Sequence, residues 1–347
     1  MSQLTTHALP TIGKEWHLVG RPRGWPTPAN FALRETALAR PGPGQALVRN
    51  LYFSVDPYMR RRMDDVESYV PPFALDQPMD GGAIGIVLAS EADGLTVGDH
   101  VRHGLGWRDY AVVDAATVTV LDPTAAPLSA HLGVLGNTGL TAYAGLLRLA
   151  AVKPGDVVFV SGAAGAVGST AGQIARLMGA ARVIGSAGSD EKTGLLVDEF
   201  GFDAALNYRT GPIGDQLRRA APDGIDVYFD NVGGDHLEAA LDRLNSHGRV
   251  VLCGMSAQYN DTAPATAPHN LVLAINKRLR LEGLLVTDHH DLREQFVRAA
   301  AAWIRGGELR YRETVVAGLE DGVDAFLGML RGENTGKMIV SLDVGAR

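Results

Sequence analysis

Cysteine is almost missing from this chain. The single cysteine, Cys253, has no partner for a disulfide bond within the chain and excludes a zinc site made of four cysteines. It lies in the apolar stretch 249–254, which is typical of a buried strand. We therefore expect Cys253 to be a core residue and not a reactive thiol.

Positive charge and long apolar runs are also scarce. The chain holds 32 Lys and Arg against 39 Asp and Glu, a net charge of −7, which disfavours nucleic acid or an anionic membrane surface as a partner. No uninterrupted apolar run reaches the length of a transmembrane helix. Residues 1–16 lack the cationic start and apolar stretch of a secretory signal. We therefore expect a cytoplasmic protein that acts on a small molecule and binds neither nucleic acid nor a membrane.

The chain does have enough length for two domains, and its pattern changes along the sequence. It has 347 residues, of which 46% are hydrophobic. Residues 1–131 and 310–347 hold short apolar runs between Gly- and Pro-rich turns, which predicts a β-rich domain, a sandwich or a barrel. Residues 132–309 alternate strands with helices, which predicts an α/β domain with a doubly wound parallel sheet of six strands.

A glycine-rich stretch in the second domain is the most informative motif. Val157–Val160 has the composition of a buried strand, three glycines at 162, 165 and 168 follow it, and an amphipathic helix comes next. Glycines let a turn approach a pyrophosphate closely, and the N-terminus of the helix offers free N–H groups to its charge. This context predicts a dinucleotide site. The residues expected to hold the pyrophosphate are Gly165, Ala166, Val167 and Gly168.

The residues after the second strand indicate which dinucleotide binds. NAD-binding domains place an acid there to bind the ribose hydroxyls, but residues 185–188 read Gly-Ser-Ala-Gly. Asp190 and Glu191 come later and fit the first turn of a helix capped by Ser189. The cation that follows, Lys192, favours a 2′-phosphate and hence NADPH over NADH. A solvated helix lysine is the alternative.

With these motifs the chain resembles the zinc-independent enone reductases of the medium-chain dehydrogenase/reductase superfamily. These include prostaglandin reductase/leukotriene B4 dehydrogenase, plant alkenal double-bond reductases and bacterial curcumin-reductase-like enzymes. The resemblance runs from about residue 15 to the end. The matching segments are Ser54–Arg60, Leu140–Tyr143, Ala163–Gly168, Gly188–Lys192, Asn207–Tyr208, Phe229–Gly234, Tyr259–Asn260 and Asn334–Lys337.

The resemblance implies a GroES-like, partly open barrel for the β-rich domain, which carries the catalytic side, and a Rossmann-type fold for the other domain. It implies that NADP(H) is the cofactor and that hydride goes to the β-carbon of an α,β-unsaturated ketone or aldehyde. Tyr259 matches a tyrosine that relatives use to stabilise the developing enolate oxygen, and either Tyr259 or water supplies the proton to the α-carbon. Tyr58 is a second candidate, with helix packing as an equal alternative.

Further cofactor contacts are expected from three residues. Tyr208 is expected to hydrogen-bond the 2′-phosphate beside Lys192. Asn231, at the carboxyl end of the fourth predicted strand, should face the cofactor. Asn334, in the segment that returns to the first domain, is expected to lie near the nicotinamide half. Turn chemistry remains an alternative for both asparagines, because each closely precedes a glycine.

A catalytic metal is not expected. The zinc-dependent alcohol dehydrogenases of the superfamily bind their metal through Cys and His ligands. This chain has Ser54–Pro57 where the first Cys ligand would fall and Asp80–Gly85 where the His would fall. The polar run 288–291, Asp-His-His-Asp, is expected to be a turn because no further spaced ligand lies nearby.

Other functions and the assembly remain open at this point. A quinone reductase or a dehydrogenase of lipid hydroxyls would share the cofactor and the pocket, and a non-catalytic NADPH-binding sensor belongs to another class. The stretch Arg278–Val286 is expected to be the outer strand of the sheet, which predicts a homodimer by pairing of two such edges. Residues 257–269 are expected to form a mobile loop.

Overall fold

The computed structural model of the chain describes residues 8–263 and 266–342. The chain forms two compact units: one contains Met1–Leu132, Val315–Arg331 and Met338–Arg347, and the other contains Gly133–Thr314 and Gly332–Lys337. The sequence-based division assigned residues 310–314 and 332–337 to the β-rich domain, whereas here they pack with the second unit. Residues 1–7 of the stretch considered above as a signal lie outside the described part. No helix among the described residues has both the length and the hydrophobicity to cross a membrane.

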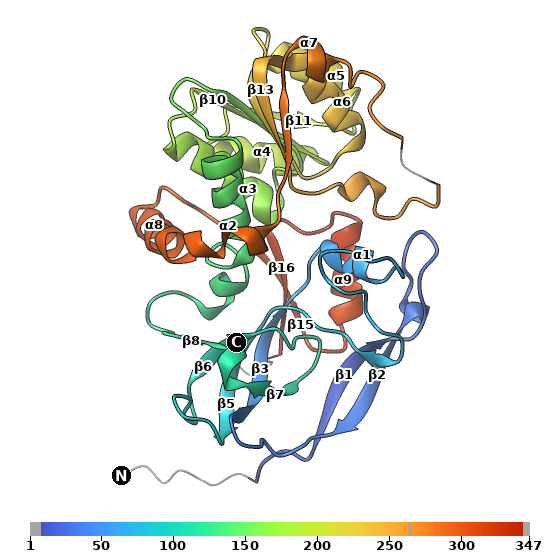
Figure 1. Ribbon diagram of the computed structural model, residues 1–347, viewed down its shortest axis with the longest axis vertical. Helices are drawn as coiled ribbons and strands as arrows, with labels where there is room; N and C mark the ends of the chain where they lie inside the picture. Colours follow the sequence, from blue (N-terminus) through green and yellow to red (C-terminus); the bar gives the residue numbers. More distant parts are fainter. Residues whose placement is uncertain (1–7, 264–265, 343–347) are drawn as a thin grey trace. The chain divides into compact units, whose positions relative to one another are not determined.

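The second unit contains the predicted doubly wound parallel sheet (Figure 1). Its strand order is β11-β10-β9-β12-β13-β14, so the first strand in sequence lies in the middle and the order reverses beside it. The central strands are apolar on both faces, as a parallel sheet covered by helices requires. The strands are β9 (Val157–Val160), β10 (Arg182–Ala187), β11 (Ala204–Asn207), β12 (Ile225–Asp230), β13 (Leu244–Leu252) and β14 (Arg280–Gly283).

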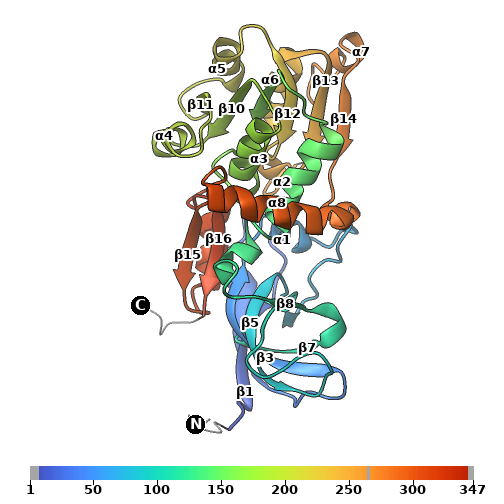
Figure 2. The same cartoon turned by 90° about the vertical axis from the view of Figure 1, so that its left-hand side faces the viewer.

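Helices connect these strands and cover the sheet, as Figure 2 shows from a second side. The helices of this unit are α2 (Asn137–Ala144), α3 (Ala166–Leu177), α4 (Asp190–Asp198), α5 (Ile213–Ala220), α6 (Gly234–Arg243), α7 (Leu273–Asn276) and α8 (Arg293–Gly306). Shorter helical turns are η4 (Gly145–Leu149), η5 (Ser256–Gln258) and η6 (Val286–Leu292). The predicted sixth strand is shorter than expected, because its pairing with β13 ends where Gly283 meets Leu252 and the chain then turns into η6.

The first unit is β-rich, as predicted, and contains two sheets. A seven-stranded sheet has the order β15-β16-β3-β5-β6-β8, with β7 also paired to β3, and a three-stranded sheet has the order β2-β1-β4. The strands are β1 (Ile12–Leu18), β2 (Phe31–Ala37), β3 (Gln45–Ser54), β4 (Gln77–Pro78), β5 (Ala83–Ser90), β6 (His100–His103), β7 (Tyr110–Asp114), β8 (Thr119–Leu121), β15 (Glu313–Ala317) and β16 (Lys337–Ser341). The helices are η1 (Pro28–Asn30), α1 (Tyr58–Arg62), η2 (Ala115–Thr117), η3 (Leu128–Leu132) and α9 (Gly322–Leu330).

A buried aromatic group marks the core of the first unit. Trp107 is fully buried and packs against Phe53 and Phe326, with ring centroids 5.2 and 6.1 Å away. Its backbone has φ 62°, a left-handed conformation that is costly for a bulky residue. The surrounding structure must therefore hold this segment in place.

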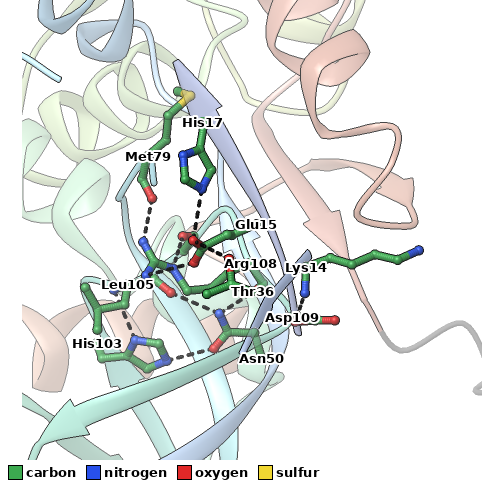
Figure 3. A network of polar contacts seen from close by, with 11 residues as sticks. Lys14, Glu15, His17, Thr36, Asn50, Met79, His103, Leu105, Arg108 and Asp109 are labelled. Atoms are coloured by element: carbon green, nitrogen blue, oxygen red, sulfur yellow. Dashed lines mark hydrogen bonds and ion pairs between the residues drawn. The ribbon is translucent and has the colours of Figure 1, made fainter. Parts of the chain in front are cut away.

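Hydrogen bonds between polar groups hold the segment around Trp107 in place (Figure 3). The amide nitrogen of Asn50 donates to the carbonyls of Leu105 (3.0 Å) and Arg108 (2.9 Å), on either side of Trp107. The Arg108 guanidinium donates to the carbonyl of Met79 (2.8 Å). The ring of His103 bonds Asn50 through Nε2 (2.9 Å) and accepts the Leu105 N–H at Nδ1 (3.1 Å). This pattern fixes a neutral tautomer of His103, in keeping with its pKa, which burial and then the charge of Arg108 lower to about 4.

Candidate active site

The glycine turn of the second unit joins β9 to α3. Gly165 is the N-cap of α3 and brings no side chain to its first N–H groups. Gly162 has φ 58°, which suits glycine. A Cβ at Gly168 would overlap the carbonyl oxygen of Gly162, so this glycine lets the helix lie close against the turn. The turn therefore presents backbone N–H groups at a helix N-terminus, an arrangement suited to a pyrophosphate.

The return segment, defined here as residues 332–337, lies against this turn. The N–H of Gly336 donates to the carbonyl of Ala164 (2.8 Å), and Gly336 forms a parallel bridge with Gly165. The side-chain amide of Asn334 donates to the carbonyl of Gly336 (2.8 Å), an internal contact of the segment. The structure thus brings Asn334 to the edge of the predicted pyrophosphate site.

Lys192 connects α4 to the return segment. Its Nζ donates to the carbonyl oxygens of Gly332 (2.6 Å) and Asn334 (2.7 Å). An ammonium group has three N–H donors, so one is left after these two bonds. Burial and then the charge of Arg209 lower the pKa of Lys192. Lys192 is therefore more than the solvated helix residue that the sequence left as an alternative.

Tyr208, the other predicted phosphate contact, lies beside Gly188 at the ends of β10 and β11. The Tyr208 hydroxyl lies 2.6 Å, and Arg209 Nε 3.4 Å, from the position that a Cβ would take at Gly188. The Tyr208 ring meets His236 edge to face, with centroids 5.3 Å apart. Asp190, the nearest acid in sequence, accepts a hydrogen bond from the Asn207 amide (2.7 Å). Sequence reasoning missed Arg209, although its place directly after Tyr208 was a usable signal.

Asn231 lies where β9 and β12 end side by side. Its backbone N–H donates to Ser161 Oγ (2.9 Å) and its side-chain amide to the Ser161 carbonyl (2.7 Å). Next to it, the buried Asp230 accepts hydrogen bonds from the Tyr228 hydroxyl (2.6 Å) and from the N–H of Gly233 (2.8 Å). Burial raises the pKa of Asp230, and these donors oppose the rise. Asn231 is held in position at the switch point of the sheet, where ligands bind in this fold class.

Tyr259 comes just beyond β13, at the C-cap of η5. Its hydroxyl lies 3.4 Å from the position that a Cβ would take at Gly254, and the carbonyl oxygen of Asn231 lies 3.3 Å from the same position. The hydroxyl therefore folds back toward the carboxyl ends of β12 and β13. Residues 264 and 265 of the loop expected to be mobile lie outside the described residues.

Tyr58 lies in the first unit, at the start of α1. Burial, followed by the charge of Asp56, raises the pKa of its hydroxyl well above the ordinary value of 10, so the group is protonated at neutral pH. Arg62 of the same helix is buried, forms a bidentate pair with Asp80 and stacks 3.9 Å above the ring of Phe73. These contacts of Arg62 give α1 a fixed place on its unit.

Two features considered in the sequence do not form a metal site in the described residues. Within residues 8–263 and 266–342, no group of three or more His, Cys, Asp or Glu is placed to hold a metal ion. In the polar run 288–291, Asp291 pairs with Arg148 (3.0 Å). Burial raises the pKa of Cys253 to about 12, which leaves it an unreactive thiol at neutral pH.

Comparison with known proteins gives matches along nearly the whole chain. Residues 14–121 match the N-terminal domain of oxidoreductase, and residues 166–302 match the family described as zinc-binding dehydrogenase. An NADPH-dependent curcumin reductase from Escherichia coli is 39% identical over 94% of this chain and 96% of its own. A 2-alkenal reductase (NADP(+)-dependent) from Nicotiana tabacum is 40% identical over 91% of this chain and 94% of its own.

A solved structure agrees with these matches. CurA from Vibrio vulnificus, crystallised in complex with NADPH, is 39% identical and superposes with a TM-score of 0.91, covering 94% of this chain and 98% of its own. The likeness therefore extends over both units.

Proposed function

The chain belongs to the NADP-dependent, zinc-independent oxidoreductases of the medium-chain dehydrogenase/reductase superfamily, and on that premise we propose that it reduces the C=C bond of α,β-unsaturated ketones and aldehydes with NADPH. The observation that carries the proposal is the Tyr259 hydroxyl at the carboxyl ends of β12 and β13, beside a nucleotide site that has no acid at the end of β10.

The residues of the second unit fit the cofactor. The N–H groups of Ala166, Val167 and Gly168 would hold the pyrophosphate at the start of α3. The Tyr208 hydroxyl and Arg209 lie around Gly188, Lys192 follows in the first turn of α4, and residues 185–188 carry no carboxylate. A 2′-phosphate suits that charge, whereas the ribose hydroxyls of NADH would find no acid to accept their hydrogen bonds. When bound, NADPH supplies the hydride.

The side chains stabilise the charge that develops on the substrate. As hydride reaches the β-carbon, the C=C pair moves toward the carbonyl and negative charge grows on its oxygen. We assign the hydrogen bond to that oxygen to the Tyr259 hydroxyl. Tyr58, in the first unit, is the second candidate that the resemblance implies. A proton from Tyr259 or from water then reaches the α-carbon and completes the saturated ketone or aldehyde.

Asn231 and Asn334, the remaining predicted residues, support the cofactor site in this proposal. Asn231 keeps the ends of β9 and β12 together beside the cofactor. Asn334 belongs to the return segment that crosses the glycine turn. We assign cofactor binding to the second unit, including the return segment; of the two candidate catalytic residues, Tyr259 belongs to this unit and Tyr58 to the first.

The assembly we propose is a homodimer that forms in the cytoplasm. Within the described residues β14 is the last strand of the sheet on its side. Near it in sequence, around α7, the structure exposes three apolar side chains, of which Ile275 is 77% exposed. Apolar groups beside an unpaired strand favour pairing with a second copy.

The oligomeric state is tested by light scattering on the native chain and on Ile275→Asp at micromolar concentration. The proposal predicts the mass of two chains for the native protein and a shift toward one for the variant. A native mass of one chain contradicts the dimer.

Activity assays separate the proposed reaction from its alternatives. NADPH oxidation should be measured with medium-chain alkenals, cyclic and aryl enones, and quinones, and NADP⁺ reduction with lipid alcohols. The proposal predicts turnover of enones or alkenals at higher kcat/KM than the other classes. Preferential turnover of quinones or alcohols would support one of the other two oxidoreductases, and binding of NADPH without turnover of any class would support a sensor.

A further inference from the structure

Asp230, at the last position of β12, places a negative charge inside the protein. The residue is fully buried. Its Oδ1 accepts hydrogen bonds from Ser161 Oγ (3.1 Å), the Tyr228 hydroxyl (2.6 Å) and the N–H groups of Val232 (2.9 Å) and Gly233 (2.8 Å). Within the described part of the chain, its Oδ2 has no hydrogen-bond partner. A proton on Oδ2 would meet no acceptor, and the backbone N–H groups can only donate to Oδ1, so these contacts fit an ionised carboxylate.

The donors to Asp230 are all neutral groups. Charges inside proteins are normally paired with an opposite charge, because a buried ion has lost its hydration. Here the only compensation from these partners is the partial positive charge at the N-terminus of α6, which has Gly233 as its N-cap. Capping this turn is an ordinary role for aspartate, but a neutral asparagine could form the same contacts without burying a charge. The negative charge therefore calls for a cationic partner.

Asp230 lies next to two parts of the proposed active site. On one side, Ser161, which bonds its carboxylate, directly precedes the glycine turn. On the other side, its main-chain carbonyl accepts the N–H of Gly254 (3.0 Å), and the Tyr259 hydroxyl lies 3.4 Å from the position that a Cβ would take at Gly254. The proposed reaction places the substrate oxygen at this hydroxyl, and only a few covalent bonds separate that oxygen from the carbon that receives the hydride. Hydride transfer would therefore take place near the buried charge.

We propose that the carboxylate of Asp230 stabilises the oxidised cofactor and thereby assists hydride transfer. When the hydride leaves with its electron pair, the nicotinamide ring becomes positively charged, and the substrate takes up the negative charge that Tyr259 is assigned to bind. Asp230 supplies the opposite charge on the donor side. Because it is fully buried, it acts through its electric field and not by contact. This inference rests on the proposed function, since it adds a residue to the same site.

The affinities for the two redox forms of the cofactor test this inference. The preference ratio, defined as the Kd for NADP⁺ divided by the Kd for NADPH, should be measured by calorimetry for the native chain, Asp230→Asn and Tyr228→Phe. Asp230→Asn keeps an acceptor oxygen for the donors and removes the charge. Tyr228→Phe is the matched control, because it removes one donor to the same oxygen but keeps the charge and the ring stack on Phe159, with centroids 5.1 Å apart.

The charge of Asp230 should appear as a shift of the preference ratio. Two unit charges about 10 Å apart, at an effective dielectric constant of about 20, attract by an amount that corresponds to roughly tenfold in an equilibrium constant. We therefore expect the ratio to rise by about fivefold to twentyfold in Asp230→Asn and to stay within about twofold in Tyr228→Phe. At saturating NADPH, the single-turnover rate with a simple enone should fall by about threefold to tenfold in Asp230→Asn, because the ring is only partly charged in the transition state.

A folded Asp230→Asn variant whose preference ratio stays within about twofold of the native ratio would overturn the inference and leave Asp230 as a cap of the turn before α6. An equal shift in Tyr228→Phe would also overturn it, by tracing the shift to a local disturbance. If Asp230→Asn does not fold, the native chain decides. A cationic ring that loses water far from any anion binds more weakly than the neutral ring, so a native ratio above about five contradicts the inference and a lower ratio supports it.

The proposed function can fail separately from this inference. The preference ratio is measured without substrate and does not depend on which substrate is reduced. A native chain that shows the expected shift in Asp230→Asn but reduces no enone or alkenal would overturn the proposed reaction and keep the role of Asp230 toward the cofactor. Reduction of enones by the native chain, with an unchanged ratio in Asp230→Asn, would overturn the inference alone.

Discussion

The polar segment around Trp107 in the first unit and the strand ends of the second unit use their donors in opposite ways. Asn50, His103 and Arg108 direct their N–H groups to neighbouring carbonyls and side chains. At the strand ends, the start of α3 and the guanidinium of Arg209 keep donors available. Paired donors stabilise the fold, whereas donors held in place without a protein partner are ready for a ligand. Variants in the two regions should therefore have different consequences.

The largest effect is expected at Gly168. In Gly168→Ala the new methyl group would overlap the Gly162 carbonyl, and Ala163 Cα would stand only 2.8 Å from it. The turn has to move, and we expect NADPH binding to become undetectable together with a loss of about 3 kcal/mol in the free energy of unfolding. Calorimetry and urea unfolding measure both. Gly155→Ala, at a turn where a Cβ meets no atom but φ is 93°, is a control for backbone strain alone.

A large effect on rate, without one on stability, is expected at Tyr259. Tyr259→Phe keeps the ring and removes the hydroxyl that is proposed to donate to the developing oxyanion. We expect kcat to fall by about tenfold to a thousandfold, with the NADPH dissociation constant within twofold of the native value. Steady-state kinetics with a simple enone measure this. A native kcat in the variant removes Tyr259 from the mechanism.

Asn50 should show the reverse pattern. Asn50→Ala leaves the carbonyls of Leu105 and Arg108 without their donor and His103 without its acceptor, all in a buried place. The free energy of unfolding should fall by about 2–4 kcal/mol, while the folded variant keeps its cofactor affinity within twofold. Urea unfolding measures the change in the free energy of unfolding, and NADPH titration at low temperature measures the cofactor affinity of the folded variant. A selective loss of NADPH binding would contradict the division between the two regions.

A smaller effect, on acid stability, should arise in both regions. Burial holds the pKa of His103 and of His236 at about 4, below the ordinary value of 6.5. Each ring is neutral in the folded chain and takes up a proton first in the unfolded chain. Their contribution to stability is therefore present above pH 6.5 and is lost as the pH falls toward 4, by about 1–3 kcal/mol for each ring.

His236→Phe isolates the contribution of the second unit. The phenyl ring keeps the stack on Phe159 and cannot titrate. Urea unfolding of the native chain and the variant between pH 7.5 and 4.5 should give a smaller acid loss in the variant. An unchanged pH dependence would mean that His236 does not contribute.

The two regions also differ in how well the sequence predicted them. The glycine turn was predictable, because only glycine suits its backbone and the motif is local. The contact of Lys192 with Gly332 and Asn334 was not, since it joins residues about 140 positions apart and depends on the path of the return segment. Arg209 was missed for a related reason: it comes close to Gly188 only because β10 and β11 pair side by side.

The same limit applies to the elements. The six parallel strands were predicted from short apolar runs, but the end of β14 is set by its pairing with β13 and not by its own composition. The left-handed φ of Trp107 could not be predicted from the sequence, because contacts between distant residues stabilise it. Asn50 donates to the carbonyl of Arg108, and the Arg108 guanidinium donates to the carbonyl of Met79. Local patterns predicted the elements and the cofactor turn, whereas contacts between distant segments decide the details of the site.

The most direct test of the proposed reaction follows the hydride itself. NADPH carrying deuterium at the transferable position of the nicotinamide should be incubated with the enzyme and a simple enone, in the presence of a strong chelator. The account predicts a saturated ketone with deuterium on its β-carbon and a rate that the chelator does not change. Deuterium on the carbonyl carbon, in an allylic alcohol, would contradict it.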